Sequence, residues 1–326
     1  MLDKTNVKVL DKVVVRFSGD SGDGMQLAGN IFTNVSAGVG NEVSTFPDYP
    51  AEVRAPQGSL SGVSGFQVSV GRGVHTPGDR CDVLLAMNPA ALKQNVRFLK
   101  SGGIIIVDSD SFGESDLRKA LFATNDPYAE LGIDPAQVLE VPVTTMTRAA
   151  LADSGMDNKS ILKCRNIFAL GVVCWLFDRP IEAACHYISK KFAKKPAIAK
   201  ANCAVVQAGY DFGHNTHASM STYRIETEDP RPGVYTDING NTATAWGLIM
   251  ASEKSGRPLF LGSYPITPAT DILQELAKRK DLGVKACQME DEIAGVCSAI
   301  GASFAGNLAV TSTSGPGLAL KGEGIG

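Results

Sequence analysis

Short apolar runs alternate with helix-type segments over two parts of this chain, first up to about residue 108 and again beyond residue 237. Two runs in the first part, DVLLAM (82–87) and GIIIVD (103–108), are apolar almost throughout, as strands covered on both faces usually are. Further strand candidates are residues 13–17 and 66–70, and the helix candidates are residues 25–38 and 89–99. This alternation predicts an α/β fold with a parallel or mostly parallel sheet and crossover helices.

Local signals mark several helix starts. Asn88 can cap a helix, and Pro89 suits its first position because proline lacks the N–H that a first-turn residue would leave unbonded. From residue 159 to about 212 the pattern is helical. We expect one helix through residue 177, capped by Asn158 or Ser160, and two more that begin at Pro180 and Pro196.

A polar, turn-rich stretch divides the chain. Residues 214–236 have few apolar side chains and a D-P-R-P-G turn signal, so we expect an exposed linker between domains at 1–213 and 237–326. The second domain should contain helices at 242–254, 269–280 and 291–305 and strands at 258–261, 284–289 and 308–311. These strands are too few for a complete doubly wound sheet, so we expect the second domain to be truncated at residue 326.

Composition narrows the classes of function. With 44% hydrophobic residues, 20% charged residues and a formal charge of −3, the chain has no general attraction for nucleic acid or anionic membranes. Its longest apolar run, residues 167–177, is shorter than the ~20 residues that span a bilayer, which predicts a cytoplasmic protein. The seven scattered cysteines include no C-x-x-C, and only His214 and His217 are close in sequence, so we predict no metal site.

The motif FSGDSGDG, residues 17–24, joins a strand candidate to a helix candidate. A helix start favours anions, yet the glycine spacing does not match the dinucleotide fingerprint, and Asp20 and Asp23 place negative charge where phosphate would sit. Two interpretations stay open: a tight turn that needs glycine, and a loop that faces a phosphate-bearing ligand.

The stretch YPAEVRAPQGSLSGVSGFQVSV, residues 49–70, contains a polar connection rich in proline and glycine, with Tyr49, Glu52 and Arg54. It is longer than most strand-to-helix loops. A solvated loop with a Glu–Arg pair and a lid or partner-contact loop are both compatible with this pattern.

In the stretch LGSYPITPATDILQEL, a buried strand is expected to end at Gly262, and prolines keep residues 264–268 extended before a helix begins at Pro268 or Ala269. Thr267 then lies beside the start of that helix. Its hydroxyl can cap the helix or face a ligand, because ligand sites in open α/β sheets lie at the carboxyl ends of strands.

Glu292 is expected at the start of the next helix, which follows the strand that ends at Met289. The residues after it are small and apolar, which predicts a helix buried nearly all round and a carboxylate partly shielded from water. Such a carboxylate is suited to hold or share a proton, although acids at a helix start also serve as plain dipole complements. The segment TSTSGPG (311–317), made of small hydroxyl and glycine residues, is expected to form a third loop at a strand end.

The segments SYPITPATDILQEL, QMEDEIAGVCSAIGASFAGN and AVTSTSGPGLALKGEGIG, in this order, resemble the pyrimidine-binding domain of the α subunit of 2-oxoacid:ferredoxin oxidoreductases, which use thiamine diphosphate. FSGDSGDGMQLAGN, YPAEVRAPQGSLSGVSGFQV and DVLLAMNPAAL resemble the γ domain of the same family, although the family turn G-x-G-G-Q-G differs from SGDSGDG. The resemblance therefore implies a γ-type α/β domain followed by an incomplete, transketolase-like pyrimidine-binding α/β domain.

This resemblance also assigns roles to residues. Glu292 matches the glutamate that bonds N1′ of the thiamine pyrimidine and promotes removal of the thiazolium C2 proton. Thr267 and Tyr264 match positions that face the substrate. Pro265, Ile266, Ser314 and Gly315 match cofactor-binding positions.

The family implies further components. A separate β subunit is expected to share the thiamine diphosphate site and to carry Mg²⁺ and a [4Fe-4S] cluster, in an (αβ)₂ hetero-oligomer. Coenzyme A and ferredoxin are the expected co-substrate and electron acceptor, and 2-oxoglutarate is the expected oxoacid. Two alternatives stay open: pyruvate or a broad range of 2-oxoacids, and a non-catalytic nucleotide- or anion-binding module.

Overall fold

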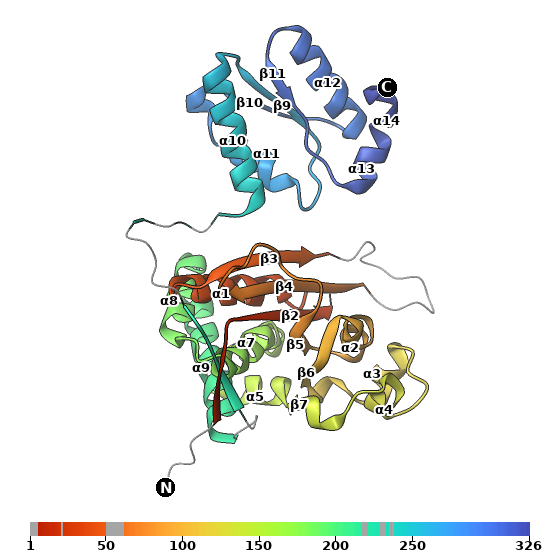
Figure 1. Cartoon of the computed structure of the whole chain (residues 1–326), viewed down its shortest axis with the longest axis vertical. Helices are drawn as coiled ribbons and strands as arrows, with labels where there is room; N and C mark the ends of the chain where they lie inside the picture. The colour runs from red at the N-terminus through yellow and green to blue at the C-terminus, as the bar shows by residue number, and fades with distance from the viewer. Residues whose placement is uncertain are drawn as a thin grey trace. The chain divides into compact units, whose positions relative to one another are not determined.

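The computed structural model describes residues 6–20, 22–49, 62–216, 221–227, 233–234, 236 and 238–326. Contacts divide the chain into two compact units, Met1–Gly233 and Val234–Gly326 (Figure 1). Both units are of the α/β class, as the sequence predicts.

The first unit is built on a six-stranded mixed sheet with the strand order β3-β4-β2-β5-β6-β7. Strands β2, β5, β6 and β7 run parallel to one another, and β4 is antiparallel to both β2 and β3. The sheet is therefore parallel in one part and antiparallel at the β3 edge. The strands are β2 (Lys12–Asp20), β3 (Glu42–Asp48), β4 (Val63–Gly71), β5 (Cys81–Ala86), β6 (Leu99–Asp108) and β7 (Val138–Val141).

Helices cover both faces of this sheet (Figure 1). One face carries α1 (Met25–Gly38), α5 (Val143–Ala150), α6 (Asn158–Leu162), α7 (Arg165–Leu176), α8 (Ile181–Lys191) and α9 (Pro196–Thr216). The other carries α2 (Pro89–Asn95), α3 (Glu114–Lys119) and α4 (Pro127–Leu131). Short 3₁₀ turns occupy Val96–Phe98, Ser109–Ser111 and Pro135–Gln137.

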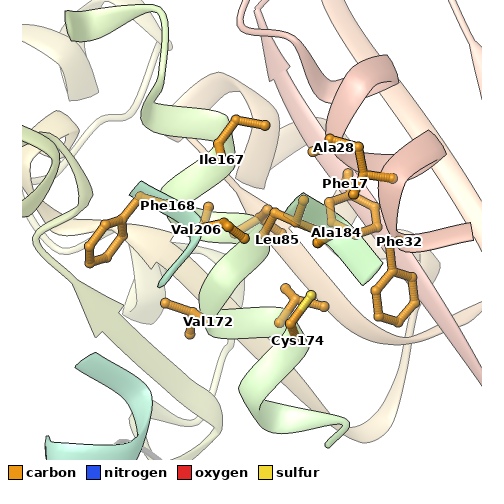
Figure 2. Close-up of a cluster of buried hydrophobic side chains, with 14 of the residues drawn as sticks. Phe17, Ala28, Phe32, Leu85, Ile167, Phe168, Val172, Cys174, Ala184 and Val206 are labelled. Atoms are coloured by element: carbon orange, nitrogen blue, oxygen red, sulfur yellow. The ribbon is translucent and has the colours of Figure 1, made fainter. Parts of the chain in front are cut away.

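Strand residues alternate between two hydrophobic clusters because successive side chains point to opposite faces of a sheet. Val15 and Leu85 belong to the larger cluster, whereas Val14 and Leu84 belong to the smaller one. Figure 2 shows the larger cluster, where side chains from two strands and four helices converge: Phe17, Ala28, Phe32, Leu85, Ile167, Phe168, Val172, Cys174, Ala184 and Val206.

Helix α7 is the centre of this cluster, and its sequence explains why. Every residue from Asn166 to Leu176 is buried. Glycines let α9 approach closely, since a Cβ at Gly171 would lie 2.2 Å from the Val206 carbonyl oxygen and a Cβ at Gly209 would lie 2.1 Å from that of Phe168. The apolar run at residues 167–177 thus forms the core of a folded unit.

Several predicted elements are confirmed. Helix α1 spans the predicted residues, α9 begins at Pro196, and the Asn88 side chain caps α2 by accepting a hydrogen bond of 2.8 Å from the Ala91 N–H. The helix predicted at 89–99 is too long. It ends at Asn95, and Leu99 already begins β6, because Leu99 pairs with Cys81 in the sheet.

The predicted helix through residue 177 is in fact two helices. Asp157 caps α6 by accepting a hydrogen bond of 2.9 Å from the Ser160 N–H, so neither Asn158 nor Ser160 is the cap. Helix α7 begins separately at Arg165.

The expectation of an exposed linker at residues 214–236 is also partly wrong. Helix α9 continues to Thr216, and β8 (Ser221–Ile225) pairs in parallel with β1 (Asn6–Leu10). Ile225 is buried on the larger cluster, which explains why this mostly polar segment is ordered as a strand. His217 and residues 228–232 lie outside the described residues.

The second unit has a three-stranded parallel sheet with the order β10-β9-β11. Its strands are β9 (Leu259–Ser263), β10 (Lys285–Gln288) and β11 (Leu308–Val310). The helices are α10 (Gly240–Ser255), α11 (Thr270–Ala277), α12 (Glu292–Phe304), α13 (Gly315–Leu320) and α14 (Gly322–Ile325), with a 3₁₀ turn at Lys280–Leu282.

Side chains of β9 alternate between the two helical layers of this unit. Leu259 and Leu261 pack with α10 and α11, and Gly262 meets α12. In Figure 1, α10 and α11 lie on one side of these strands and α12 on the other. The expectation that α12 is buried nearly all round is wrong. A helix that lies on one face of a small sheet buries only one stripe, so Ile293, Ile300 and Phe304 are 45%, 41% and 91% exposed.

No helix in the described part of the chain has both the length and the apolar character of a membrane span.

Candidate functional site

Three loops of the second unit meet at one edge of its sheet. Because β9, β10 and β11 are parallel, their carboxyl ends lie at the same edge. Residues 264–268 follow β9, residues 289–291 follow β10, and residues 311–314 follow β11. This is the edge at which open α/β sheets bind ligands.

Gly262 brings α12 close to the end of β9. A Cβ at Gly262 would lie 2.2 Å from the Ser298 Oγ and 2.8 Å from the Gly295 carbonyl oxygen, both in α12. Only glycine leaves room for this contact, because real Cβ atoms essentially never approach other atoms within 3.0 Å. The close packing holds the first turn of α12 at the strand ends.

Glu292 is the first residue of α12 and is half-buried. Its neighbour Asp291 is the helix cap, since its Oδ1 accepts a hydrogen bond of 2.7 Å from the Ala294 N–H. Asp291 therefore serves as the dipole complement of the helix, and the Glu292 carboxylate is not needed for that purpose.

The loop after β11 packs directly against Glu292. A Cβ at Gly317 would lie 2.8 Å from the Glu292 Cγ, 3.2 Å from its Oε1 and 2.0 Å from the Thr313 Oγ1. The SGPG segment thus contacts the glutamate through a position where a side chain does not fit. Ser314 precedes α13 as its N-terminal boundary residue, and Gly315 is the first residue of that helix.

Thr313 adds an unsatisfied polar group to this region. Its Oγ1 is buried, and it has no hydrogen-bond partner among the described residues. A buried hydroxyl without a partner costs free energy, and such groups in folded proteins usually have a bound molecule or a functional reason.

Hydrogen bonds tie the strand ends together. The Ser263 Oγ, at the end of β9, donates to the Ser312 carbonyl oxygen over 2.8 Å and lies 2.9 Å from the Ser312 Oγ. The Met289 N–H donates to the Ser263 carbonyl oxygen over 2.8 Å. All three loops are consequently linked through Ser263.

Residues 264–268 lie at the open side of this edge. Tyr264 is 36% exposed, Pro265 and Ile266 are half-buried, and Thr267 is exposed. The loop is held at its end, where the Asn241 Nδ2 donates to the Pro268 carbonyl oxygen over 2.8 Å.

The helix predicted to begin at Pro268 or Ala269 begins at Thr270, and no side chain caps it. Thr267 is therefore not a helix cap. Within the described residues its hydroxyl has no hydrogen-bond partner and no bond to Glu292, so it is free to face a ligand.

Sequence reasoning missed Lys321, which is the buried cation of this region. It is 2% exposed, and its Nζ donates to the Thr311 Oγ1 over 2.7 Å. Burial lowers the pKa of the Lys321 ammonium, and the Glu292 carboxylate opposes the decrease. One lysine in a short glycine-rich segment carries no sequence signal of burial.

In the first unit, the glycine motif forms a tight turn. Gly22 and Gly24 have φ angles of 108° and 77°, which glycine adopts readily. Asp23 forms an ion pair of 3.2 Å with Arg165. Burial raises the pKa of the Asp23 carboxyl, and Arg165 and the Asp20 N–H oppose the rise.

These contacts support the turn interpretation of the motif. Ser21 lies outside the described residues, as do Glu52 and Arg54 of the long loop, so the interpretations of that loop stay open. The described residues contain no group of three or more His, Cys, Asp or Glu side chains placed to hold a metal ion.

Two family models match the chain. One, described as pyruvate ferredoxin/flavodoxin oxidoreductase, matches residues 14–212. The other, described as the thiamine diphosphate-binding part of pyruvate flavodoxin/ferredoxin oxidoreductase, matches residues 252–326. The second match contains the three loops described above.

Named relatives agree with these matches. The 2-oxoglutarate oxidoreductase subunit KorA of Mycobacterium tuberculosis is 48% identical over 97% of this chain and 48% of that protein. The α subunit of 2-oxoacid:ferredoxin oxidoreductase 1 from Aeropyrum pernix is 27% identical over 65% of this chain and 35% of that protein.

A solved structure is also similar. It is 2-oxoglutarate:ferredoxin oxidoreductase from Magnetococcus marinus with 2-oxoglutarate, coenzyme A and succinyl-CoA bound. The TM-score is 0.69 with 26% identity, over 95% of this chain and 49% of that chain. The chain spans about half the length of this protein and of the mycobacterial relative, and less of the Aeropyrum one.

Proposed function

Because the chain belongs to the pyruvate ferredoxin/flavodoxin oxidoreductase family, we propose that it is the fused γ–α part of a thiamine diphosphate-dependent 2-oxoacid:ferredoxin oxidoreductase. The reaction is oxidative decarboxylation of a 2-oxoacid to an acyl-CoA and CO₂, with electrons passed to ferredoxin. The observation that carries this proposal is the position of Glu292, half-buried at a strand-end edge and in contact with the SGPG loop.

The residues present fit the pyrimidine end of thiamine diphosphate. Glu292 offers a carboxylate that is not used for capping, and Thr313 offers a buried hydroxyl without a partner in the described chain. Both are suited to the polar edge of a heteroaromatic ring. When bound, thiamine diphosphate supplies the carbon nucleophile that attacks the 2-oxo carbonyl.

Glu292 is the residue that holds or shares a proton at the ring nitrogen N1′. Pro265 and Ile266, which are half-buried, and Ser314 and Gly315, at the start of α13, would contact the cofactor. Tyr264 and Thr267, which are more exposed, face the incoming 2-oxoacid.

The diphosphate end of the cofactor, its Mg²⁺ and a [4Fe-4S] cluster belong to a partner β subunit in this proposal. We therefore expect the chain by itself to bind thiamine diphosphate weakly, and to act as part of an (αβ)₂ assembly in the cytoplasm.

The choice of 2-oxoglutarate as the proposed substrate rests on the names of two similar proteins. The mycobacterial protein and the Magnetococcus enzyme are both named for 2-oxoglutarate. The Aeropyrum relative, named for 2-oxoacids, supports a broad 2-oxoacid specificity as the second candidate, at lower identity, and pyruvate is named in the descriptions of both family models. Coenzyme A is the proposed acyl acceptor.

The test uses the full-length protein co-purified with its partner subunit, and measures viologen reduction that depends on a 2-oxoacid and coenzyme A. Glu292→Gln should reduce the rate at least roughly a hundredfold, because proton transfer by a positioned side chain contributes about 10²–10⁴. Glu290→Gln, at an exposed position two residues earlier, is the matched control and should keep the wild-type rate.

An unchanged rate in Glu292→Gln would refute the proton-transfer role of Glu292. A wild-type assembly that shows no reduction dependent on a 2-oxoacid would refute the enzyme proposal and favour a non-catalytic binding module. Comparison of 2-oxoglutarate with pyruvate in the wild-type assay decides the substrate. A higher kcat/KM for pyruvate would overturn the choice of 2-oxoglutarate.

A further inference from the structure

Lys321 has an environment that packing alone does not explain. It lies between α13 and α14 and is 2% exposed. Its Nζ donates to the Thr311 Oγ1 over 2.7 Å and lies 3.5 Å from the Ser312 carbonyl oxygen. The described part of the chain gives it no ion pair with a carboxylate within 4.0 Å.

A buried ammonium without a close carboxylate is unfavourable for stability. Methionine has a similar length and would fill the same space without the cost of desolvating a charge. Hydrogen bonds from charged donors are, however, stronger than neutral ones and fix their acceptors more firmly. The lysine is thus better suited to hold its acceptors in place than to stabilise the fold.

The acceptors of Lys321 belong to the loop that reaches Glu292. Thr311 and Ser312 connect β11 to the SGPG segment, and a Cβ at Gly295, in the first turns of α12, would lie 3.6 Å from the Thr311 Oγ1. Ser312 is also bonded to Ser263 at the end of β9. One ammonium therefore anchors the point where β9, β11 and α12 come together.

The Glu292 carboxylate also acts on Lys321. The two groups are near enough for the carboxylate to favour the protonated form of the lysine.

We propose that Lys321 is a positioning residue of the cofactor site, which fixes the loop at Thr311 and Ser312 against Glu292. This inference rests on the proposed function, in which Glu292 bonds the pyrimidine ring. Lys321 itself acts through the loop and the glutamate and does not touch the ring.

The test measures thiamine diphosphate binding by quenching of intrinsic fluorescence, in the full-length protein assembled with its partner subunit. Lys321→Met should raise the Kd at least roughly tenfold, because bonds from a charged donor are lost. Lys278→Met, an exposed lysine in the same unit, is the matched control and should leave the Kd within about twofold. Lys321→Arg keeps the charge and should restore most of the affinity.

A second variant separates hydrogen bonding from charge. Thr311→Val removes the acceptor of Lys321 but keeps the volume and the ammonium, so it should raise the Kd by less than Lys321→Met does. The double variant should be no weaker than Lys321→Met alone, since both changes break the same bond. At saturating cofactor, the KM for the 2-oxoacid should stay near the wild-type value in every variant.

The outcomes distinguish the two proposals. If the wild-type assembly binds thiamine diphosphate and Lys321→Met binds it equally well, the positioning role is refuted and the proposed function stands. Additive losses in the double variant, or a loss in Lys278→Met as large as that in Lys321→Met, would also refute it. A wild-type assembly that does not bind the cofactor would refute the proposed function and this inference together.

Discussion

Gly317 is the position where one methyl group tests the contact between the SGPG segment and Glu292. In Gly317→Ala, the new Cβ would lie 2.0 Å from the Thr313 Oγ1, 2.8 Å from the Glu292 Cγ and 3.2 Å from its Oε1. Ordinary van der Waals contacts begin at 3.4 Å, so the threonine and the glutamate must both move. The φ angle of Gly317 is not positive, so the backbone itself accepts alanine.

The expected effects on stability and on binding differ in size. An extra methyl in a packed region costs about 1–3 kcal/mol, and alanine recovers up to about 1 kcal/mol over glycine in a helix. The net loss of stability should therefore be about 1 kcal/mol. If Glu292 bonds the pyrimidine ring as proposed, a displaced carboxylate forfeits a charged hydrogen bond worth about 1.5–3 kcal/mol, and cofactor binding should weaken roughly 10- to 150-fold.

The assay combines calorimetric titration with thiamine diphosphate and thermal unfolding, both on the full-length protein with its partner subunit. Gly247→Ala is the matched control, because it adds a methyl in α10 where no atom lies within 4 Å. It should leave binding unchanged and stabilise the unit slightly. The reasoning fails if Gly317→Ala binds the cofactor as tightly as the wild type, or if both variants lose affinity equally.

Two further predictions concern the first unit. Arg165→Met should destabilise the chain by roughly 2 kcal/mol in urea unfolding, because Asp23 and the fully buried Asp108 lose their cation; an unchanged midpoint would show that other groups compensate. Burial raises the pKa of the Cys81 thiol to about 11 and that of Cys174 to about 12, so iodoacetamide at pH 8 should label exposed Cys297 within minutes and leave both of them unmodified. Peptide mass spectrometry measures this, and early labelling of Cys174 would contradict the buried position of α7.

Much of the scaffold follows from local chemistry. Helix α1 was predictable because a glycine turn precedes it and a buried strand leads into that turn. The start of α2 was predictable because Asn88 and Pro89 together satisfy the needs of a helix N-terminus. The alternation of strands and helices in the second unit was predictable because each apolar run is followed by a helix-type segment.

Other elements depend on distant parts of the chain. Strand β8 has a mostly polar sequence and is stabilised by its pairing with β1, more than 200 residues earlier. Edge strand β3 is only partly buried, so its sequence lacks the apolar run that marks β5 and β6. Composition showed that α12 is apolar but not which of its faces the sheet covers.

The candidate site was predictable only in part. Motifs located the three loops, and Glu292 could be proposed because a recognisable pattern surrounds it. Lys321, Thr313 and Gly317 could not be found in the same way. Their importance lies in distances to groups that are remote in sequence or on another loop, and these distances exist only in the folded unit.

The central claim is that Glu292 bonds the pyrimidine ring of thiamine diphosphate. The most direct test is an experimental structure of the full-length protein with its partner subunit and the bound cofactor. We predict one carboxylate oxygen of Glu292 at about 2.6–3.2 Å from N1′ of the ring. A structure in which another residue or only water meets that nitrogen, while Glu292 faces away, would contradict the account.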